Sequence, residues 1–145
     1  MNSNSYFDIG ANLTHESFDK DLITVIKEAK QNNVKKICIT STSIEDTKVS
    51  LKLLENDQNF FITTCGIHPH NADTFEESNI DEIKNLSEHP SVKAIGETGL
   101  DFNRNYSKKE NQILCFKSQI GVAQDLNLPL FLHQREAHKD FMDCF

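Results

Sequence analysis

The decisive stretch of this chain is Val92-Lys93-Ala94-Ile95-Gly96-Glu97-Thr98-Gly99-Leu100-Asp101-Phe102-Asn103. It begins as an apolar, β-rich run and contains two glycines, and it places Glu97 and Asp101 where the run stops. In proteins built from parallel strands, side chains at the carboxyl ends of the strands tend to carry the chemistry. We therefore expect a strand that ends at Glu97 and a loop over residues 101–105.

Four further runs predict strands, and most of them also end in polar side chains. They cover residues 6–10, 34–40, 60–67 and 128–133; the third runs into His68-Pro69-His70 and the fourth ends at His133. Helical spacing of apolar residues predicts helices over 19–32 with Asp19 as N-cap, from Ser43 to about 56, over 80–88, from 107 onward and over 136–145. Strict alternation of strand and helix predicts a parallel sheet with right-handed crossovers.

Two architectures satisfy this alternation, an open doubly wound sheet and a (β/α) barrel. A closed barrel needs eight units and about 250 residues, whereas this chain has 145 residues and offers five units in one domain over 1–145. No Gly-x-Gly-x-x-Gly or Walker loop follows a strand, which removes the usual reason to expect a nucleotide-binding doubly wound fold.

Composition restricts the classes of function. The chain has 22 acidic and 15 basic residues and a net charge of −7, which argues against a broad basic surface for nucleic acid but allows a local phosphate site beside a divalent cation. No apolar run approaches the roughly 18 residues of a membrane span. The four cysteines are scattered without a Cys-x-x-Cys pair, so we expect reduced thiols and a cytoplasmic location, or a nuclear one in a eukaryote.

Glu97 and His133 are the candidate metal ligands. Neighbouring strands lie about 5 Å apart, so side chains at the ends of two adjacent strands could share one ion. Carboxylate and imidazole ligands suit zinc, manganese or magnesium. The alternative for Glu97 is a carboxylate that caps a turn, and the alternative for His133 is an ordinary core or loop histidine.

His68 and His70 form a second candidate group. Pro69 restricts the backbone between them, and two histidines one residue apart in extended chain point the same way, toward a metal or a phosphate oxygen. The alternative is a solvated, histidine-rich turn. Further polar side chains would surround such a site from the loops, and the arginines among them could grip phosphate or simply lie on the surface: Asp101, Asn103, Arg104, Arg135 and His138.

Together, four stretches in this order and spacing resemble the TatD family of metal-dependent deoxyribonucleases. They are Phe7-Asp8-Ile9-Gly10-Ala11-Asn12-Leu13-Thr14, Cys65-Gly66-Ile67-His68-Pro69-His70, Ala94 through Asn105, and Leu128 through His138. The resemblance extends over almost the whole chain, from Tyr6 to Phe145.

The resemblance implies a TIM-barrel hydrolase of the amidohydrolase type that cleaves DNA phosphodiesters with a divalent metal, often as a 3′-to-5′ exonuclease. It implies Glu97 and His133 as metal ligands, with His68 and His70 near the substrate phosphate and Arg135 stabilising its negative charge. Mg²⁺ is the expected ion, with Mn²⁺ or Zn²⁺ as alternatives, and DNA is the expected substrate, with RNA as an alternative.

Two departures from the family pattern leave other readings open. Many members open with a His-x-His pair, where this chain reads Asn12-Leu13-Thr14, and the family's later ligands would lie beyond Phe145. We therefore expect a partial barrel of five units. The alternatives to a nuclease are a catalytically inactive half-barrel, which could self-associate through its open sheet edges, and a hydrolase of amide or ester bonds on the same fold.

Overall fold

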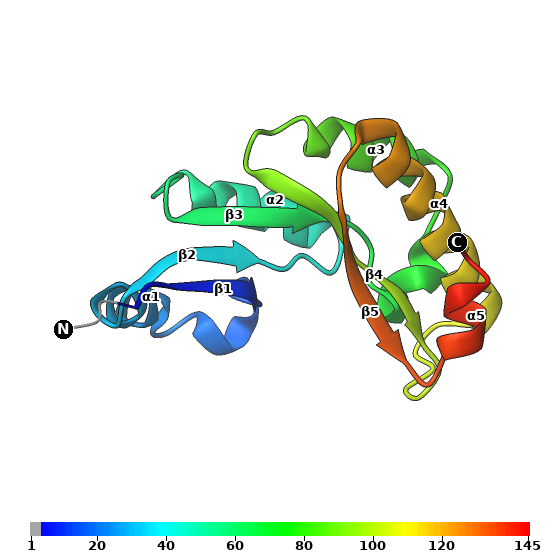
Figure 1. Ribbon diagram of the computed structural model, residues 1–145, viewed down its shortest axis with the longest axis horizontal. Coiled ribbons are helices and arrows are strands. Elements are labelled where there is room, and N and C mark those ends of the chain that lie inside the picture. Colours follow the sequence, from blue (N-terminus) through cyan, green and yellow to red (C-terminus); the bar gives the residue numbers. More distant parts are fainter. Residues whose placement is uncertain (1–3) are drawn as a thin grey trace.

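The computed structural model describes residues 4–145, which form a single five-stranded parallel sheet with the strands in sequence order. Figure 1 shows that the sheet is strongly twisted, with β4 and β5 running steeply across the direction of β1 to β3. The strands are β1 (Tyr6–Ala11), β2 (Val34–Ile39), β3 (Phe61–Cys65), β4 (Val92–Asp101) and β5 (Leu130–Arg135). The predicted alternation is confirmed, and the sheet is curled as in part of a barrel, not open and doubly wound.

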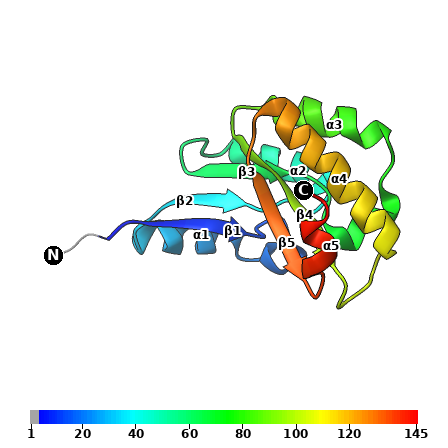
Figure 2. The ribbon, with the colours of Figure 1, turned by 45° about the vertical axis from the view of Figure 1, so that its right-hand side comes forward.

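Helices connect the strands and pack on the sheet. Figure 2 shows α3, α4 and α5 grouped around β4 and β5, with α1 and α2 beside β2 and β3. The helices are α1 (Leu22–Gln31), α2 (Ile44–Leu54), α3 (Ser78–Ser87), α4 (Lys109–Leu126) and α5 (His138–Met142), and two 3-10 helices span Glu16–Phe18 and Pro69–Thr74. Within residues 4–145 no helix is both long and apolar enough to cross a membrane.

Apolar side chains between the sheet and the helices hold the fold together. One cluster joins β2 and β3 to α1 and α2 around Phe61, a second joins β3 and β4 to α2, α3 and α4 around Ile95, and a third joins β4 to α4 and α5 around Leu100. The three named side chains are no more than 1% exposed. On the other face of the sheet, the Phe131 ring of β5 reaches Gly10 of β1, where an added Cβ would lie 3.2 Å from the ring.

Several predicted boundaries were wrong, for local reasons. Asp19 does not begin the first long helix: it ends the short 3-10 helix, and α1 begins after Asp21. The last helix spans only the five residues His138–Met142, and it begins after Glu136, where a positive φ of 52° is not helical. The prediction for Ser43 is confirmed, because its hydroxyl accepts a hydrogen bond from the Asp46 amide at 3.1 Å.

The largest correction concerns β4, which continues through Asp101 instead of ending at Glu97. Gly96 pairs with Phe131 and Thr98 with Leu132, so Glu97 is an extra residue in a bulge. Ile95 and Leu100 both face the helices. In a regular strand, two residues five positions apart would face opposite sides of the sheet. The bulge therefore turns Glu97 and everything after it to the opposite face from the one they would take in a regular strand.

Candidate metal centre

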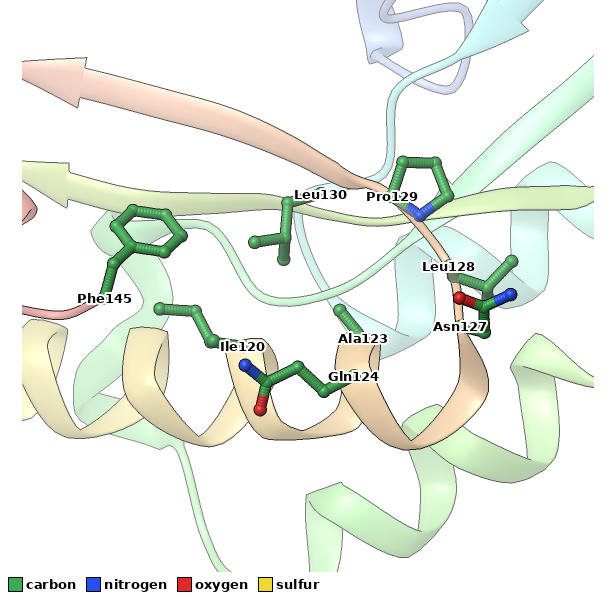
Figure 3. A pocket seen from close by; sticks show the side chains of 8 residues that line it. All are labelled: Ile120, Ala123, Gln124, Asn127, Leu128, Pro129, Leu130 and Phe145. Carbon is green, nitrogen blue, oxygen red and sulfur yellow. The ribbon is translucent and has the colours of Figure 1, made fainter.

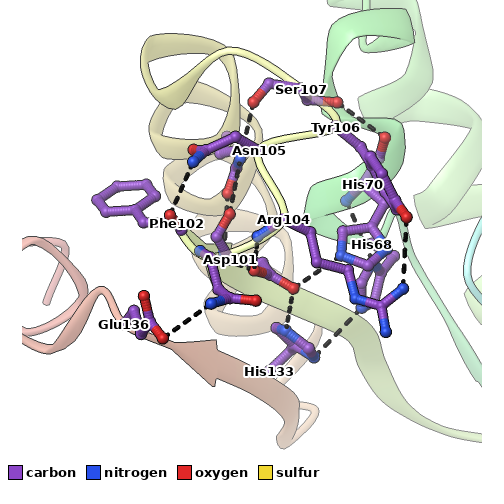
Figure 4. Close-up of polar contacts among 12 residues, drawn as sticks. His68, His70, Asp101, Phe102, Arg104, Asn105, Tyr106, Ser107, His133 and Glu136 are labelled. Carbon is purple, nitrogen blue, oxygen red and sulfur yellow. Dashed lines mark hydrogen bonds and ion pairs between the residues drawn. The ribbon is translucent and has the colours of Figure 1, made fainter.

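Five polar side chains converge beside β4 and β5. His68 and His70 begin the 3-10 helix that follows β3, Glu97 and Asp101 come from β4, and His133 comes from β5. Ring nitrogens of the three histidines lie within 4.8 Å of one another, so this group could hold a metal ion. Figure 4 shows the histidine rings and Asp101 turned toward one another.

Glu97 and His133 lie side by side, as the sequence predicts. The Oε1 atom of Glu97 is 3.1 Å from Nδ1 of His133 and 3.7 Å from Nε2 of His68. Two glycines permit this approach of the strands: a Cβ on Gly96 would meet the carbonyl of Phe131, a Cβ on Gly99 would meet that of His133, and both glycines have φ above +130°.

Asp101 connects two of the histidines and is 1% exposed. Its Oδ2 atom lies 2.7 Å from Nε2 of His70 and 3.2 Å from Nε2 of His133, while Oδ1 accepts hydrogen bonds from the amides of Asn103 and Arg104. Burial opposes ionisation of this carboxyl, yet the Arg104 amide, His70, the Asn103 amide and His133 together hold its pKa well below the usual range. An ionised carboxylate only accepts, so both ring nitrogens that face it carry protons.

The ring of His68 also has a fixed proton position, which its own contacts determine. Burial lowers the pKa of His68 to about 4 despite the nearby Glu97, so its ring is neutral. Its Nδ1 accepts a hydrogen bond from the His70 amide at 3.1 Å, which leaves the ring proton on Nε2. That N–H faces Nδ1 of His133 at 3.2 Å, so His68 is a hydrogen-bond donor in this arrangement and not a free ligand.

Glu97 and His133 have the chemistry of a ligand pair. The close approach of the His133 ring lowers the pKa of Glu97, and the Glu97 carboxylate in turn raises the pKa of His133. Because Nε2 of His133 donates to Asp101, the lone pair of its neutral ring is on Nδ1, the atom beside Glu97. Donor atoms that share one ion at about 2.0–2.2 Å lie roughly 3.0–3.5 Å apart, and the 3.1 Å separation of these two donors fits.

The predicted rim residues divide into two groups. Arg104 lies at the cluster: its Nη1 is 3.4 Å from the Tyr106 hydroxyl, and the Tyr106 ring is 4.8 Å from that of His70. Asn103 instead donates to Glu136 at 2.8 Å.

Arg135 and His138 are exposed, and in the described part of the chain no ion pair joins either of them to the cluster. The role expected for Arg135 therefore stays a prediction. The position expected for Asp101, in a loop at the rim of the site, was wrong, because Asp101 is a buried residue of β4. The signal that could have found Asp101 is its spacing of four from Glu97, which places both on one face of a strand that does not end.

Two hollows in the described part of the chain lie away from this cluster. One of about 410 Å³ lies between α4 and the segment before β5, and Figure 3 shows it lined by apolar groups such as Ile120, Leu130 and Phe145. Another of about 420 Å³ lies between α1 and α2 and includes Ile26 and Phe61. Neither contains a histidine, so the clustered titratable groups and not the hollows identify the candidate site.

Comparison with known proteins places the chain in a family. A family model described as TatD related DNase matches residues 7–145. The chain is 44% identical over 136 residues to "3'-5' ssDNA/RNA exonuclease TatD" of Musicola paradisiaca and 42% identical to the protein of the same name from Erwinia amylovora, covering 94% of this chain and 52% of each relative. It therefore spans about half the length of these curated relatives.

Solved structures agree on the fold. A hydrolase of the TatD family from Entamoeba histolytica superposes with a TM-score of 0.87 at 31% identity, over 97% of this chain and 53% of that one. An uncharacterized amidohydrolase from Saccharomyces cerevisiae gives 0.86 at 27% identity, over 97% and 51%. The curled sheet agrees with these structures, the family model covers residues 7–145, and this chain belongs to the TatD family.

Proposed function

We propose that this chain carries the metal-binding part of a nuclease that removes nucleotides from the 3′ end of single-stranded DNA, with RNA as a second substrate. The relatives' printed names and the family model support this activity. The observation that carries it is the 3.1 Å approach of Glu97 and His133, a carboxylate and an imidazole nitrogen with its lone pair on the facing atom.

Four residues of the cluster have distinct roles in this proposal. Glu97 and His133 hold the cation, and Asp101 orients His133 through the ring nitrogen that the cation does not use. A divalent cation held there would draw electron density from the phosphoryl group and so favour attack by water. His68 donates its Nε2–H to a phosphate oxygen, where a neutral donor stabilises the charge that develops.

The arginines complete the phosphate site. Arg104, beside Tyr106 and His70, would bind the phosphate on the side away from β5, with a guanidinium suited to two oxygens at once. Arg135 follows His133 by two residues on the same strand, so it would approach the phosphate from the β5 side. The predicted ion is Mg²⁺, and Mn²⁺ and Zn²⁺ are the alternatives that carboxylate plus imidazole ligation suits.

The test is nucleotide release from single-stranded DNA, followed as stepwise shortening of a 5′-labelled strand, with Mg²⁺, Mn²⁺ or Zn²⁺ and with and without a chelator. We expect release that a chelator abolishes and that Glu97→Gln and His133→Gln each abolish. Glu28→Gln on α1 and His89→Gln before β4 are matched controls, because they make the same changes far from the cluster, and both should retain activity. Metal-independent release, or full activity in Glu97→Gln, would overturn the proposal, and release from amide or ester substrates alone would favour the alternative hydrolase.

We also propose that the chain self-associates through its edge strands. Within residues 4–145, β1 and β5 each pair with another strand on one side only. Exposed apolar side chains lie on both: Ile9 is 67% exposed, Phe7 is 50% exposed and Leu132 is 45% exposed. Unpaired strand edges of this kind recruit further strands. We expect concentration-dependent dimers on a sizing column that Ile9→Lys weakens and Ile23→Lys, on exposed α1, does not; a monomer at all concentrations would refute this.

The cellular location proposed for this activity is the cytoplasm. Cys38, Cys65 and Cys115 are buried and unpaired, a state typical of proteins in a reducing compartment. Fractionation of cells that express the tagged chain would test the location, and recovery in an oxidising compartment would contradict it.

A further inference from the structure

Helix α4 carries two completely buried glutamines, Gln112 and Gln119, which are both 0% exposed. Seven residues separate them, about two helical turns, so both point from the same side of the helix toward the sheet. A buried primary amide is costly unless its oxygen and both of its N–H groups find partners. Most partners of these two amides are backbone groups next to the histidine–carboxylate cluster.

Gln119 holds the segment that precedes His68. Its Oε1 accepts from the amide of Ile67 at 2.8 Å, and its Nε2 donates to the carbonyl of Ile67 at 3.0 Å. Both backbone groups of one residue are bonded, as a neighbouring strand would bond them. The pairing of β3 with β4 ends at Cys65, so the side chain of Gln119 takes over where the strand partner stops.

The same amide also reaches the bulge of β4. Nε2 of Gln119 donates to the Thr98 hydroxyl at 2.7 Å, and Thr98 directly follows Glu97. The approach is close because Gly66 has no side chain: an added Cβ there would lie 2.6 Å from Oε1 of Gln119 and 2.7 Å from the backbone of Gly96. The space that Gly66 leaves for this amide is an observation independent of the hydrogen bonds, and it indicates the same position for the Gln119 side chain.

Gln112 holds the other half of the cluster. Its Oε1 accepts from the Asp101 amide at 2.8 Å, and its Nε2 donates to the carbonyls of Asp101 at 3.2 Å and Ser107 at 2.8 Å. The Ser107 hydroxyl in turn donates to the carbonyl of His70 at 2.8 Å. Gln112 therefore fixes the backbone of Asp101 directly and that of His70 through one intermediate residue.

We propose that Gln112 and Gln119 are positioning residues, which set the geometry of the histidine–carboxylate cluster from helix α4. Gln119 places His68 and Glu97, and Gln112 places Asp101 and His70, while His133 is placed by its own strand. The inference rests on the proposed function, since it assigns these amides to the same cluster. Beside the cluster, some backbone groups of the strands and loops have no strand partner, and the two glutamine side chains supply their hydrogen bonds.

The test compares Gln119→Met and Gln112→Met with Gln124→Met, a glutamine of the same helix outside this network. Methionine keeps the length and most of the volume of glutamine and removes the hydrogen bonds of its amide. The first readout is the set of histidine-ring ¹⁵N resonances in the metal-free chain, and the second is the dissociation constant for Mn²⁺. Thermal unfolding of each variant confirms that the comparison is made on folded protein.

We expect Gln119→Met to shift the His68 ring resonances and leave those of His70 in place, and Gln112→Met to do the reverse. Both should weaken Mn²⁺ binding by about 10- to 100-fold, the usual effect of losing an outer partner of a metal ligand, and Gln124→Met should change neither readout. A merely structural role would lower stability and move all rings together or none. Folded Gln119→Met with unchanged His68 resonances and Mn²⁺ affinity would overturn the inference.

If Gln119→Met does not fold, Thr98→Val removes only the hydroxyl that Gln119 bonds, at nearly constant volume, and should still weaken Mn²⁺ binding; unchanged binding would then refute the role of Gln119. If the unaltered chain binds no Mn²⁺, the proposed function fails, but the metal-free ring resonances still decide whether the two amides position the histidines.

Discussion

Replacing Asp101 by asparagine should reverse the tautomer of His133 without removing a ligand. Oδ1 of the new amide can still accept from the amides of Asn103 and Arg104, which now bond to Asp101 at 3.1 and 2.9 Å. The other side of the group becomes an NH₂ group, whose N–H donors face Nε2 of His70 and Nε2 of His133. The His133 nitrogen must then accept, so the ring proton moves to Nδ1, the atom that faces Glu97.

The expected loss of metal affinity follows from two hydrogen-bonding arrangements of the His133 ring that exclude each other. A metal ion at Nδ1 would force the ring proton back to Nε2 of His133, where it would oppose the N–H of the substituted amide at the present 3.2 Å spacing. Leaving such a buried pair unsatisfied costs about 1–3 kcal/mol, or roughly 5- to 150-fold in metal affinity. Stability should change less than affinity, because the amide keeps partners when no metal is bound.

Titration calorimetry with Mn²⁺ measures the affinity, and histidine-ring ¹⁵N spectra report which nitrogen of His133 carries the proton. Asp73→Asn is the matched control: Asp73 also holds backbone and side-chain amides, at Lys108 and Asn111, but contacts no histidine. Unchanged Mn²⁺ affinity in a folded Asp101→Asn variant, with the His133 proton still on Nε2, would refute the reasoning.

Three further predictions test local features. Ser43→Ala should lower the free energy of unfolding by about 1 kcal/mol, since it removes the N-cap of α2; no change in urea denaturation would contradict this cap. Gly99→Ala should disrupt the pairing of β4 with β5, because its Cβ would meet the carbonyl of His133 at a positive φ, and loss of Mn²⁺ binding measures it; Gly121→Ala, with open space around the added Cβ, is the control. Burial and Asp8 raise the pKa of Cys38 from 9.0 to about 11, so the folded chain keeps a proton that the unfolded chain loses, and stability should fall between those pH values; Cys38→Ala should remove that part of the decline.

The sequence predicted the order of the elements because the signals for it are local. Apolar runs of strand length, separated by helical spacing, allow one parallel arrangement with short connections. Ser43 shows the same point at one position, since a cap depends only on the residues of the following turn. The ends of helices were predicted less accurately, as Asp19 and Asp21 show. Both are of a residue type that commonly begins helices, and the 3-10 helix that ends at Asp19 moves the start of α1 to after Asp21.

The centre of the cluster could be predicted only in part, because it depends on pairing between distant residues. That Glu97 and His133 meet follows from adjacent parallel strands and could be predicted. The contacts of Gln119 with Ile67 could not, because a glutamine on a long helix is usually exposed and nothing near it in the chain indicates a partner 52 residues away.

The bulge in β4 explains why Asp101 was placed at the rim. A strand that ends at Glu97 leaves Asp101 in a loop, and a regular strand through Asp101 turns both carboxylates toward the helices, with Ile95. Only an extra residue opposite β5 brings both to the histidine side, and Gly96 makes that possible through a backbone conformation that a side chain would forbid. The bulge is therefore the structural cause of the cluster, and a substitution such as Gly96→Ala should separate Glu97 from His133 while the Asp101 amide stays bonded to Gln112.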